Sequence, residues 1–210
     1  SKIGGKYGTS INFNVSTAFA PIQNTEGFDP NGKSRVMYNT RLFEKSNNLY
    51  WSDVNMNIYK KFSKNFNLTL NYYNISIDND VAKVTNDASG MIYSDIGVIE
   101  AGYKINKKHS LRGELQGLFT KKDKGDWATV LIEYNYGPKF FFSVMDQYNF
   151  GNPNEALQLH YLIGTFGYVH ESTRISLSYG RQRAGLFCVG GVCRVVPANN
   201  GLTLNFTQSF

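Results

Sequence analysis

Segments of about ten residues, in which apolar and polar side chains alternate, dominate this chain and constrain its fold more than any other feature. A period of two places apolar side chains on one face of a β-strand and polar ones on the other. Between residues 110 and 120, for example, Leu111 and Leu115 alternate with Arg112 and Glu114. Ten segments fit this pattern: residues 6–19, 50–61, 66–77, 91–105, 110–120, 127–136, 140–148, 157–169, 173–181 and 202–207.

The connections between these segments alternate in length. Short ones lie at 62–65, 106–109, 137–139 and 170–172, and longer ones at 20–48, 78–90, 121–126, 150–155 and 182–200. Transmembrane barrels have short periplasmic turns and longer external loops. The 14 Tyr and 15 Phe also favour strands. The sequence therefore predicts an all-β, antiparallel up-and-down transmembrane β-barrel of about ten strands, one domain over residues 1–210, with both termini periplasmic.

A soluble barrel or sandwich with its polar face outward is the alternative. Two features oppose it. The polar faces are rich in small Ser, Thr and Asn rather than Lys and Glu. Aromatic residues also end several strands on the apolar face, as in membrane girdles: Tyr103, Tyr134, Tyr136, Phe140 and Tyr179. We therefore expect the outer face to contact the lipid of a bacterial outer membrane, with these residues on it: Leu111, Leu115, Ile132, Leu159, Ile163, Leu177 and Leu204.

Net charge and hydropathy argue against two other classes of protein, nucleic-acid-binding proteins and helical membrane proteins. The net charge is +6, but the lysines scatter over turns instead of interleaving with aromatics along one face, so no nucleic-acid partner is expected. No run of 18 apolar residues is present, which excludes a helical membrane span. A start at Ser1 suits either a mature exported chain or a fragment.

The end of the chain has a recognisable pattern. Leu202, Leu204 and Phe206 alternate with polar residues before Phe210. This resembles the terminal strand of bacterial outer-membrane barrels, whose final aromatic residue the assembly machinery recognises. Gln208 departs from the pattern, because an apolar residue is usual there. The resemblance implies the barrel assembly machinery as a partner during insertion.

Four further stretches carry a closer resemblance: residues 3–9, 102–106, 142–146 and 188–197. Together they resemble a Bacteroidota outer-membrane barrel family without an assigned activity, and the likeness spans most of the chain. Members of that family are longer, so the resemblance implies that this chain is the C-terminal part of a larger barrel. It implies no biochemical activity.

Residues for catalysis or metal binding are scarce. The three histidines, His109, His160 and His170, are predicted at different depths, so no catalytic cluster within hydrogen-bond reach is expected. Two cysteines in a short span without a nearby histidine are too few for a metal site. We therefore expect no catalytic, cofactor-binding or metal site, and no cofactor.

Cys188 and Cys193 flank Val189-Gly190-Gly191-Val192. A Gly-Gly pair suits a two-residue hairpin turn, because glycine accepts positive φ. The two cysteines would then be cross-strand partners with Cα atoms roughly 4.5–5.5 Å apart, which suits a disulfide. The sequence predicts this bond at the tip of an extracellular hairpin, where the environment permits it.

Six charged or titratable side chains are predicted on the inner face: Glu100, Arg112, Glu114, Glu133, His160 and Arg174. They form either a network that fills the lumen or the selectivity lining of a pore. Ten strands leave a narrow, packed interior, which favours the network. If the loop after residue 120 is symmetric between Asp123 and Lys124, Glu114 lies opposite Glu133, and Arg112 is the cation placed to bridge them.

The expected function follows from the predicted barrel and from the scarcity of catalytic or metal-binding residues. The chain is predicted to be a structural anchor or a partner-binding component of an envelope complex, without catalytic activity. Its longest loops, 20–48 and 182–200, would offer a surface to another envelope or surface protein. The alternative is a passive pore or transport channel component.

Overall fold

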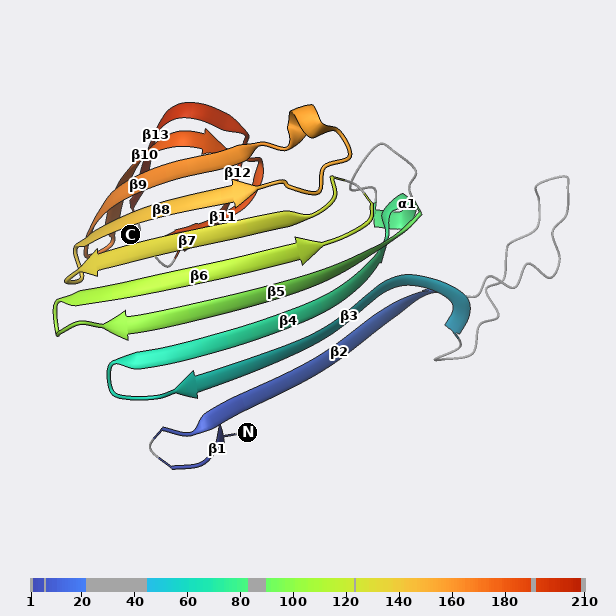
Figure 1. The fold of residues 1–210 in the computed structure, drawn as a ribbon, viewed down its shortest axis with the longest axis horizontal. Coiled ribbons are helices and arrows are strands. Elements are labelled where there is room, and N and C mark those ends of the chain that lie inside the picture. Colours follow the sequence, from blue (N-terminus) through green and yellow to red (C-terminus); the bar gives the residue numbers. More distant parts are fainter. Residues whose placement is uncertain are drawn as a thin grey trace, which may run out of the picture.

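One antiparallel sheet contains most of the chain (Figure 1). The computed structural model describes residues 2–5, 7–21, 45–82, 90–122, 124–189 and 192–208. Its strands are β1 (Lys2–Ile3), β2 (Thr9–Pro21), β3 (Lys45–Lys61), β4 (Phe66–Asp78), β5 (Met91–Lys104), β6 (His109–Phe119), β7 (Trp127–Tyr136), β8 (Phe140–Tyr148), β9 (His160–His170), β10 (Thr173–Gln182), β11 (Gly185–Val189), β12 (Val192–Val196) and β13 (Asn199–Gln208).

The order of the strands follows the sequence. β1 to β10 lie side by side, β13 joins β10, and β11 and β12 form a separate two-stranded sheet. Among the described residues, no strand connects β13 back to the β1–β2 edge, so the sheet is open. Only two short helical segments occur in the described ranges, α1 (Asn79–Ala82) and η1 (Glu155–Leu157), and neither could span a membrane. The all-β, up-and-down prediction is confirmed at this level.

The connections are sorted by length, as predicted. The turns after β3, β5, β7 and β9 are short and lie at one end of the sheet, together with both ends of the chain (Figure 1). The connections after β4, β6, β8 and β10 are longer and leave the sheet at the other end. We call these the short-turn end and the long-loop end.

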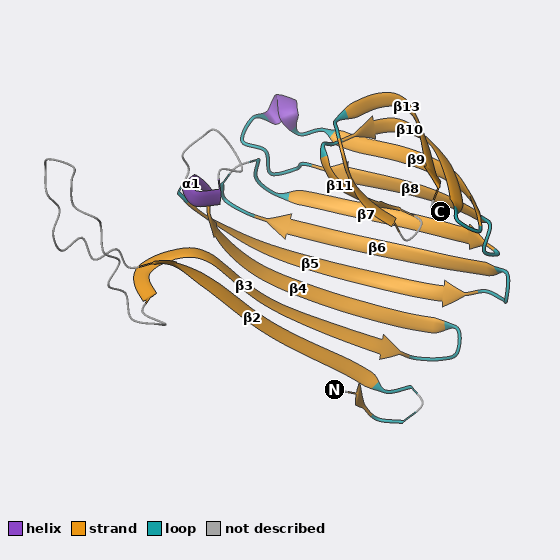
Figure 2. Ribbon diagram, turned by 180° about the vertical axis from the view of Figure 1, so that it is seen from behind, coloured by secondary structure: helices purple, strands orange, loops and turns teal. Residues whose placement is uncertain are grey.

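The two faces of the sheet differ in exposure. Along β7, Val130 and Ile132 are exposed, whereas Leu131 and Glu133 are buried. We call the face of Val130 and Ile132 the outer face and the opposite one the inner face. The β11–β12 hairpin turns back over the inner face (Figure 2), where its Val196 packs against a buried cluster. The cluster consists of Leu131, Phe141, Met145 and Ile163.

The predicted orientation of β9 is wrong. Ile163 is 3% exposed on the inner face, whereas Leu162 is 56% exposed on the outer face. The reason is a break in the strand pattern. Leu157 belongs to η1 and Leu159 precedes β9, so alternation has to be counted from His160 onward. The other residues predicted on the outer face are exposed: Leu111, Leu115, Ile132, Leu177 and Leu204.

A glycine makes room for a core ring on the inner face. A Cβ atom at Gly167 would lie 1.9 Å from Cε1 of Phe141. Phe141 is buried, and the Arg174 guanidinium lies 4.3 Å from its ring centre, so the ring has little freedom to move away. Covering a strand glycine with an aromatic ring is a known way to stabilise a sheet.

Gly167→Ala should therefore destabilise the protein by about 1–3 kcal/mol, the usual cost of overpacking a core. Gly164→Ala is the matched control, because no atom lies within 4 Å of its Cβ position on the same strand. Denaturant unfolding of the two variants of the full-length protein measures the difference. Equal midpoints would show that the Phe141 ring is free to move.

Candidate functional site

The outer face carries two rows of mainly aromatic side chains near the short-turn end. The first row consists of successive cross-strand partners from β4 to β13: Phe66, Tyr103, Leu111, Tyr134, Phe142, Phe166, Leu177 and Leu204. The second, one step nearer the turns, consists of His109, Tyr136, Phe140, Tyr168, Ile175 and Phe206. Ring contacts link them, as between Phe142 and Phe166 with centroids 4.9 Å apart. Aromatic rows of this kind border the lipid-facing band of transmembrane barrels.

Two carboxylates mark the other border of this apolar band. Asp95 accepts hydrogen bonds from Tyr72 Oη at 2.6 Å and Asn74 Nδ2 at 2.8 Å, and it is the partner of Phe119, the last residue of β6. Tyr103 lies eight residues after Asp95 on β5, which is roughly 27 Å of strand. At the strand tilt of about 40° that is typical of membrane barrels, this length would correspond to a height of about 20 Å, compared with an apolar band of about 25 Å in such barrels.

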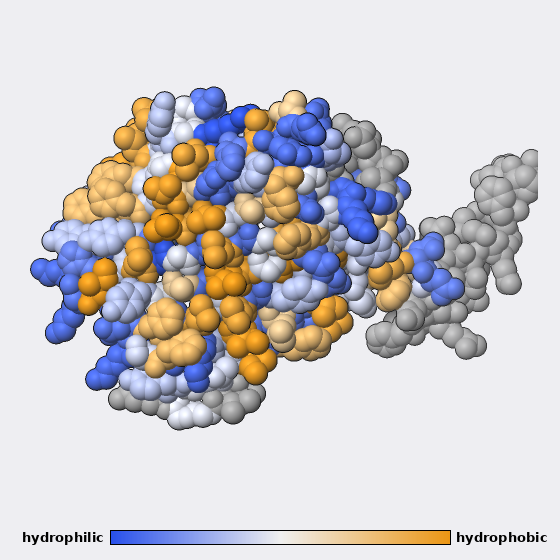
Figure 3. All heavy atoms as spheres, viewed as in Figure 1, coloured by the Kyte–Doolittle hydropathy of each residue, from blue (hydrophilic) through white to orange (hydrophobic). Residues whose placement is uncertain are grey.

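The space-filling view agrees with this distribution. Hydrophobic side chains gather over the middle of the strands (Figure 3). Hydrophilic side chains gather at the left of the view, where Figure 1 places the short turns. The outer face is thus apolar across its middle and polar at its ends.

His160 lies on the outer face, so its predicted inward position is wrong. Its side chain is 61% exposed, and its Nδ1 lies 2.6 Å from Oδ2 of Asp146, the second carboxylate at the long-loop border of the band. The ring stacks on Tyr148 with centroids 4.1 Å apart. The sequence did not predict this pair, because the leucines of η1 and of the segment before β9 suggest an inward side chain for His160. The alternation of Asp146 with the inner residues of β8 would have placed its side chain outward.

The inner face carries the predicted charged network around Arg112. Its Nε donates to Oε2 of Glu100 at 3.0 Å, and its Nη2 donates to Oε2 of Glu114. Glu100 and Glu114 are direct cross-strand partners on β5 and β6. Arg112 therefore holds together two like charges that would otherwise oppose each other in the sheet.

The predicted pairing of Glu114 with Glu133 is wrong by two residues. Glu114 lies opposite Leu131, and Arg112 lies opposite Glu133. The loop is asymmetric because Oδ1 of Asp126 accepts a hydrogen bond from Thr120 N at 2.8 Å, and β7 then begins with Trp127 opposite Leu118. Arg112 is still the bridging cation, but its second carboxylate comes from β5.

The surroundings of the remaining inward residues change along the inner face, from apolar to polar. Glu133 is buried and accepts a hydrogen bond from Asn135 Nδ2 at 3.2 Å. Arg174 lies over the Phe141 ring, away from the Arg112 cluster. On β2 to β4 the inner face is amide-rich, with Asn12 donating to Asn57 at 3.3 Å. The inner face is therefore apolar and filled near β7 to β9 but polar near β2 to β4.

The β11–β12 hairpin has the register on which the disulfide prediction depends. Cys188 lies opposite Cys193, and Val189 lies opposite Val192. The hairpin lies over the inner face rather than projecting from the long-loop end, which corrects its expected location (Figures 1 and 2). The bond itself stays a prediction, and Gly190 and Gly191 lie outside the described residues.

Mass spectrometry tests the bond independently of access to the hairpin. Trypsin should release residues 184–194 as one peptide containing both cysteines, because Arg183 and Arg194 bound it. From non-reduced protein, this peptide should be lighter by two hydrogens than the same peptide after reduction, and it should not accept a thiol-alkylating reagent. Alkylation of both cysteines without reductant would refute the bond.

The C-terminal strand places its predicted apolar residues together. Leu202, Leu204 and Phe206 are strongly exposed on the outer face of β13, which among the described strands pairs only with β10. Phe210 lies outside the described residues. Whether this strand is an assembly signal stays a prediction.

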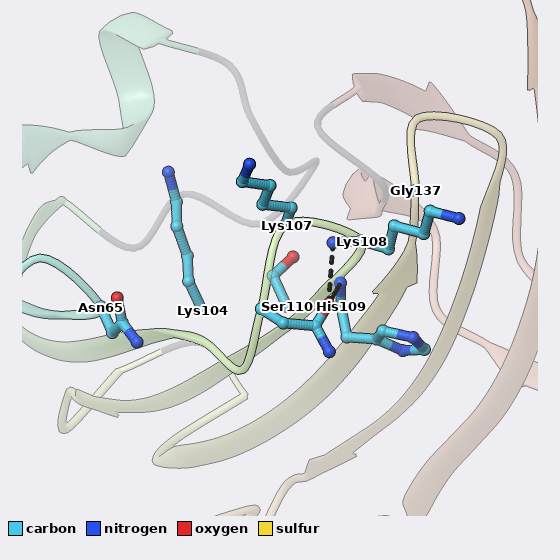
Figure 4. Close-up of a pocket in the computed structure, with 8 residues that line it drawn as sticks. Asn65, Lys104, Lys107, Lys108, His109, Ser110 and Gly137 are labelled. Carbon is cyan, nitrogen blue, oxygen red and sulfur yellow. Dashed lines mark hydrogen bonds between the residues drawn. The ribbon is translucent and has the colours of Figure 1, made fainter.

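The short-turn end contains a hollow of about 460 Å³ beside the β5–β6 turn (Figure 4). Lys104, Lys107 and Lys108 surround it, together with His109. Oδ1 of Asn106 accepts hydrogen bonds from the backbone N–H groups of Lys108 and His109, at 2.8 and 3.0 Å, and so fixes the turn. The sequence alone did not predict that these three lysines lie around one hollow.

The fold and its surfaces define an open, all-β antiparallel sheet with one apolar face. The chain belongs to a family described as a family of unknown function (DUF6029), whose model matches residues 1–210. The comparison with curated proteins and the comparison with solved structures each found no match. The predicted family without an assigned activity is thus supported in that respect, whereas its bacterial group and membrane location stay predictions.

Proposed function

We propose that this chain is an arc of a transmembrane β-barrel in a bacterial outer membrane. The observation that carries the proposal is the apolar outer face, which runs from β2 to β13 and is bordered by aromatic rows at the short-turn end. In water, so many exposed apolar side chains on a continuous surface would favour aggregation. In a bilayer, the same surface is matched to the hydrocarbon core.

The two free sheet edges support a larger barrel. Unpaired backbone groups are costly in lipid, so membrane sheets close on themselves. Among the described strands, β13 pairs only with β10, and no further strand pairs with the edge formed by β1 and β2. We propose that further strands pair with both edges, with the short-turn end in the periplasm.

Within the membrane, we propose that the protein acts as a structural anchor or a partner-binding component of an envelope complex. The β11–β12 hairpin over the inner face, with Val196 against the Leu131 cluster, favours a lumen that is partly filled. The long-loop end would carry the surface for another envelope or surface protein. The bilayer lipid and, during insertion, the barrel assembly machinery are the other proposed partners.

A passive pore is the second candidate, and the amide-rich inner face of β2 to β4 favours it. Asn12, Asn57 and Asn71 form a hydrogen-bonded row, with 2.5 Å between Asn57 Nδ2 and Asn71 Oδ1. Side chains of this kind suit a hydrated wall. The lumen of the complete barrel would then be wet on one side and filled on the other.

Planar bilayer recordings of the full-length protein separate the two candidates. An anchor should insert and give no stepwise conductance, whereas a pore should give stable steps. Insertion is checked separately by the shift in electrophoretic mobility that folded barrels show before heating. A protein that fails to insert from any detergent or lipid would contradict both candidates.

A further inference from the structure

The short-turn end is strongly basic. The four short turns and the strand ends beside them carry seven lysines against a single carboxylate, Glu171, an excess as large as the net charge of the whole chain. The long-loop end carries both signs of charge instead, with Asp78, Asp126 and Glu155 as well as Lys121 and Lys122. The seven lysines at the four short turns are Lys60, Lys61, Lys64, Lys104, Lys107, Lys108 and Lys139.

Hydrogen bonds connect neighbouring short turns to one another. We call these connected turns, with the seven lysines that they carry, the short-turn collar. Lys104 N donates to the carbonyl of Asn65 at 2.7 Å, and Gly137 N donates to the carbonyl of Lys108 at 2.5 Å. Val169 N likewise donates to the carbonyl of Lys139 at 2.7 Å. The lysines therefore project from a connected backbone, which reduces the entropy lost when they bind a ligand.

Apolar side chains lie in the same turns. Phe62 and Ile105 are more than half exposed, and the Phe62 ring packs on Phe66 with centroids 5.5 Å apart. Phe66 begins the first aromatic row of the outer face. The lysines thus lie just beyond an apolar and aromatic surface, an arrangement in which lysine stems cover apolar surface while the charged ends reach a polar interface.

We infer that the short-turn collar binds the anionic headgroups of the adjacent lipid leaflet, with Lys104, Lys107 and Lys108 around the hollow as its centre. This inference rests on the proposed membrane insertion. A phosphate fits because it is anionic, and a hollow of about 460 Å³ has the size of a small-molecule site. The exposed Phe62 and Ile105 favour lipid over an acidic protein, because they contact acyl chains in the same position.

Lipid selectivity in nanodiscs tests this directly. The full-length protein is reconstituted in phosphatidylcholine with trace spin-labelled phosphatidylglycerol or spin-labelled phosphatidylcholine, and the motionally restricted fraction of each label is measured. One lysine beside anionic lipid strengthens attachment roughly fivefold. The wild type should therefore prefer phosphatidylglycerol roughly fivefold or more at sites beside the collar, and 1 M salt should abolish the preference.

The matched variants change three lysines at either end. Lys104→Gln, Lys107→Gln and Lys108→Gln combined should bring the preference close to one. Lys121→Gln, Lys122→Gln and Lys124→Gln combined removes the same charge at the long-loop end and should leave the preference unchanged. Equal losses in both triple variants would mean that net charge alone is responsible, which would overturn the inference.

Two further outcomes separate the inference from the function on which it rests. If both labels are restricted equally in the wild type, the protein is inserted but the headgroup inference fails. If poly-glutamate then binds through the three collar lysines, the partner is an acidic polypeptide, which also overturns the lipid assignment. If neither label is restricted, the proposed membrane insertion fails and the inference fails with it.

Discussion

Leu115→Arg should prevent or severely weaken folding into a bilayer. Leu115 is 53% exposed at the middle of β6 on the outer face, between Ile99 and Val130 on the neighbouring strands. An arginine facing lipid near the bilayer midplane costs about 2–4 kcal/mol. The free energy of folding into phosphatidylcholine vesicles, measured by reversible denaturant titration of the full-length protein, should fall by that amount.

Gln116→Arg is the matched control on the next residue. Its side chain lies on the inner face, where its Nε2 donates to Glu114, so an arginine there meets a carboxylate instead of lipid. We expect a much smaller loss of stability. In water, neither surface carries this penalty, and the two variants should differ little. Equal losses in vesicles would contradict the assignment of the outer face to lipid.

Arg112→Ala should have the second-largest effect. It removes the cation that Glu100 and Glu114 share and leaves two carboxylates directly opposite each other. Breaking a fully buried ion pair costs about 3–5 kcal/mol. The Arg112 side chain is 28% exposed, so water screens part of this interaction, and we expect about 1–3 kcal/mol in denaturant titration.

Removing one of the like charges should restore part of this loss. In the Glu100→Gln background, Arg112→Ala no longer leaves two opposing carboxylates, so its effect should be clearly smaller. Lys121→Ala, in the exposed connection after β6, provides a control for the loss of an unconstrained cation. If Arg112→Ala costs no more than Lys121→Ala, or the same in both backgrounds, the bridging role is refuted.

Most of the sheet could be predicted from the alternation of side chains. The alternation is clear in β6, β10 and β13, where most outer residues are apolar and most inner residues are polar, whereas β7 places Trp127 and Leu131 on its inner face. The short turns between consecutive strands leave few possible pairing registers at the strand ends. The prediction failed for His160 and Ile163, where a turn of 3-10 helix separates the leucines before β9 from the strand and so shifts the alternation.

Features that depend on loop conformation were less accessible. The loop after β6 contains an Asp126 contact to Thr120 that displaces the expected pairing by two residues. Nothing in the alternation of β11 and β12 indicates that this hairpin folds over the inner face, because its position depends on Val196 and distant residues of β7 to β9. The basic collar was also missed, because its lysines come from turns that are adjacent only in space.

The accessibility of spin labels along β7 tests most directly whether the outer face contacts lipid. Single cysteines carrying a nitroxide at Ala128, Val130 and Ile132, and at the alternate residues Thr129 and Leu131, sample both faces of one strand. In vesicles of the full-length protein, the even positions should be accessible to oxygen and protected from a water-soluble nickel reagent, with the odd positions much less accessible to oxygen. Nickel accessibility at the even positions, equal to that of an exposed loop site, would contradict the membrane assignment.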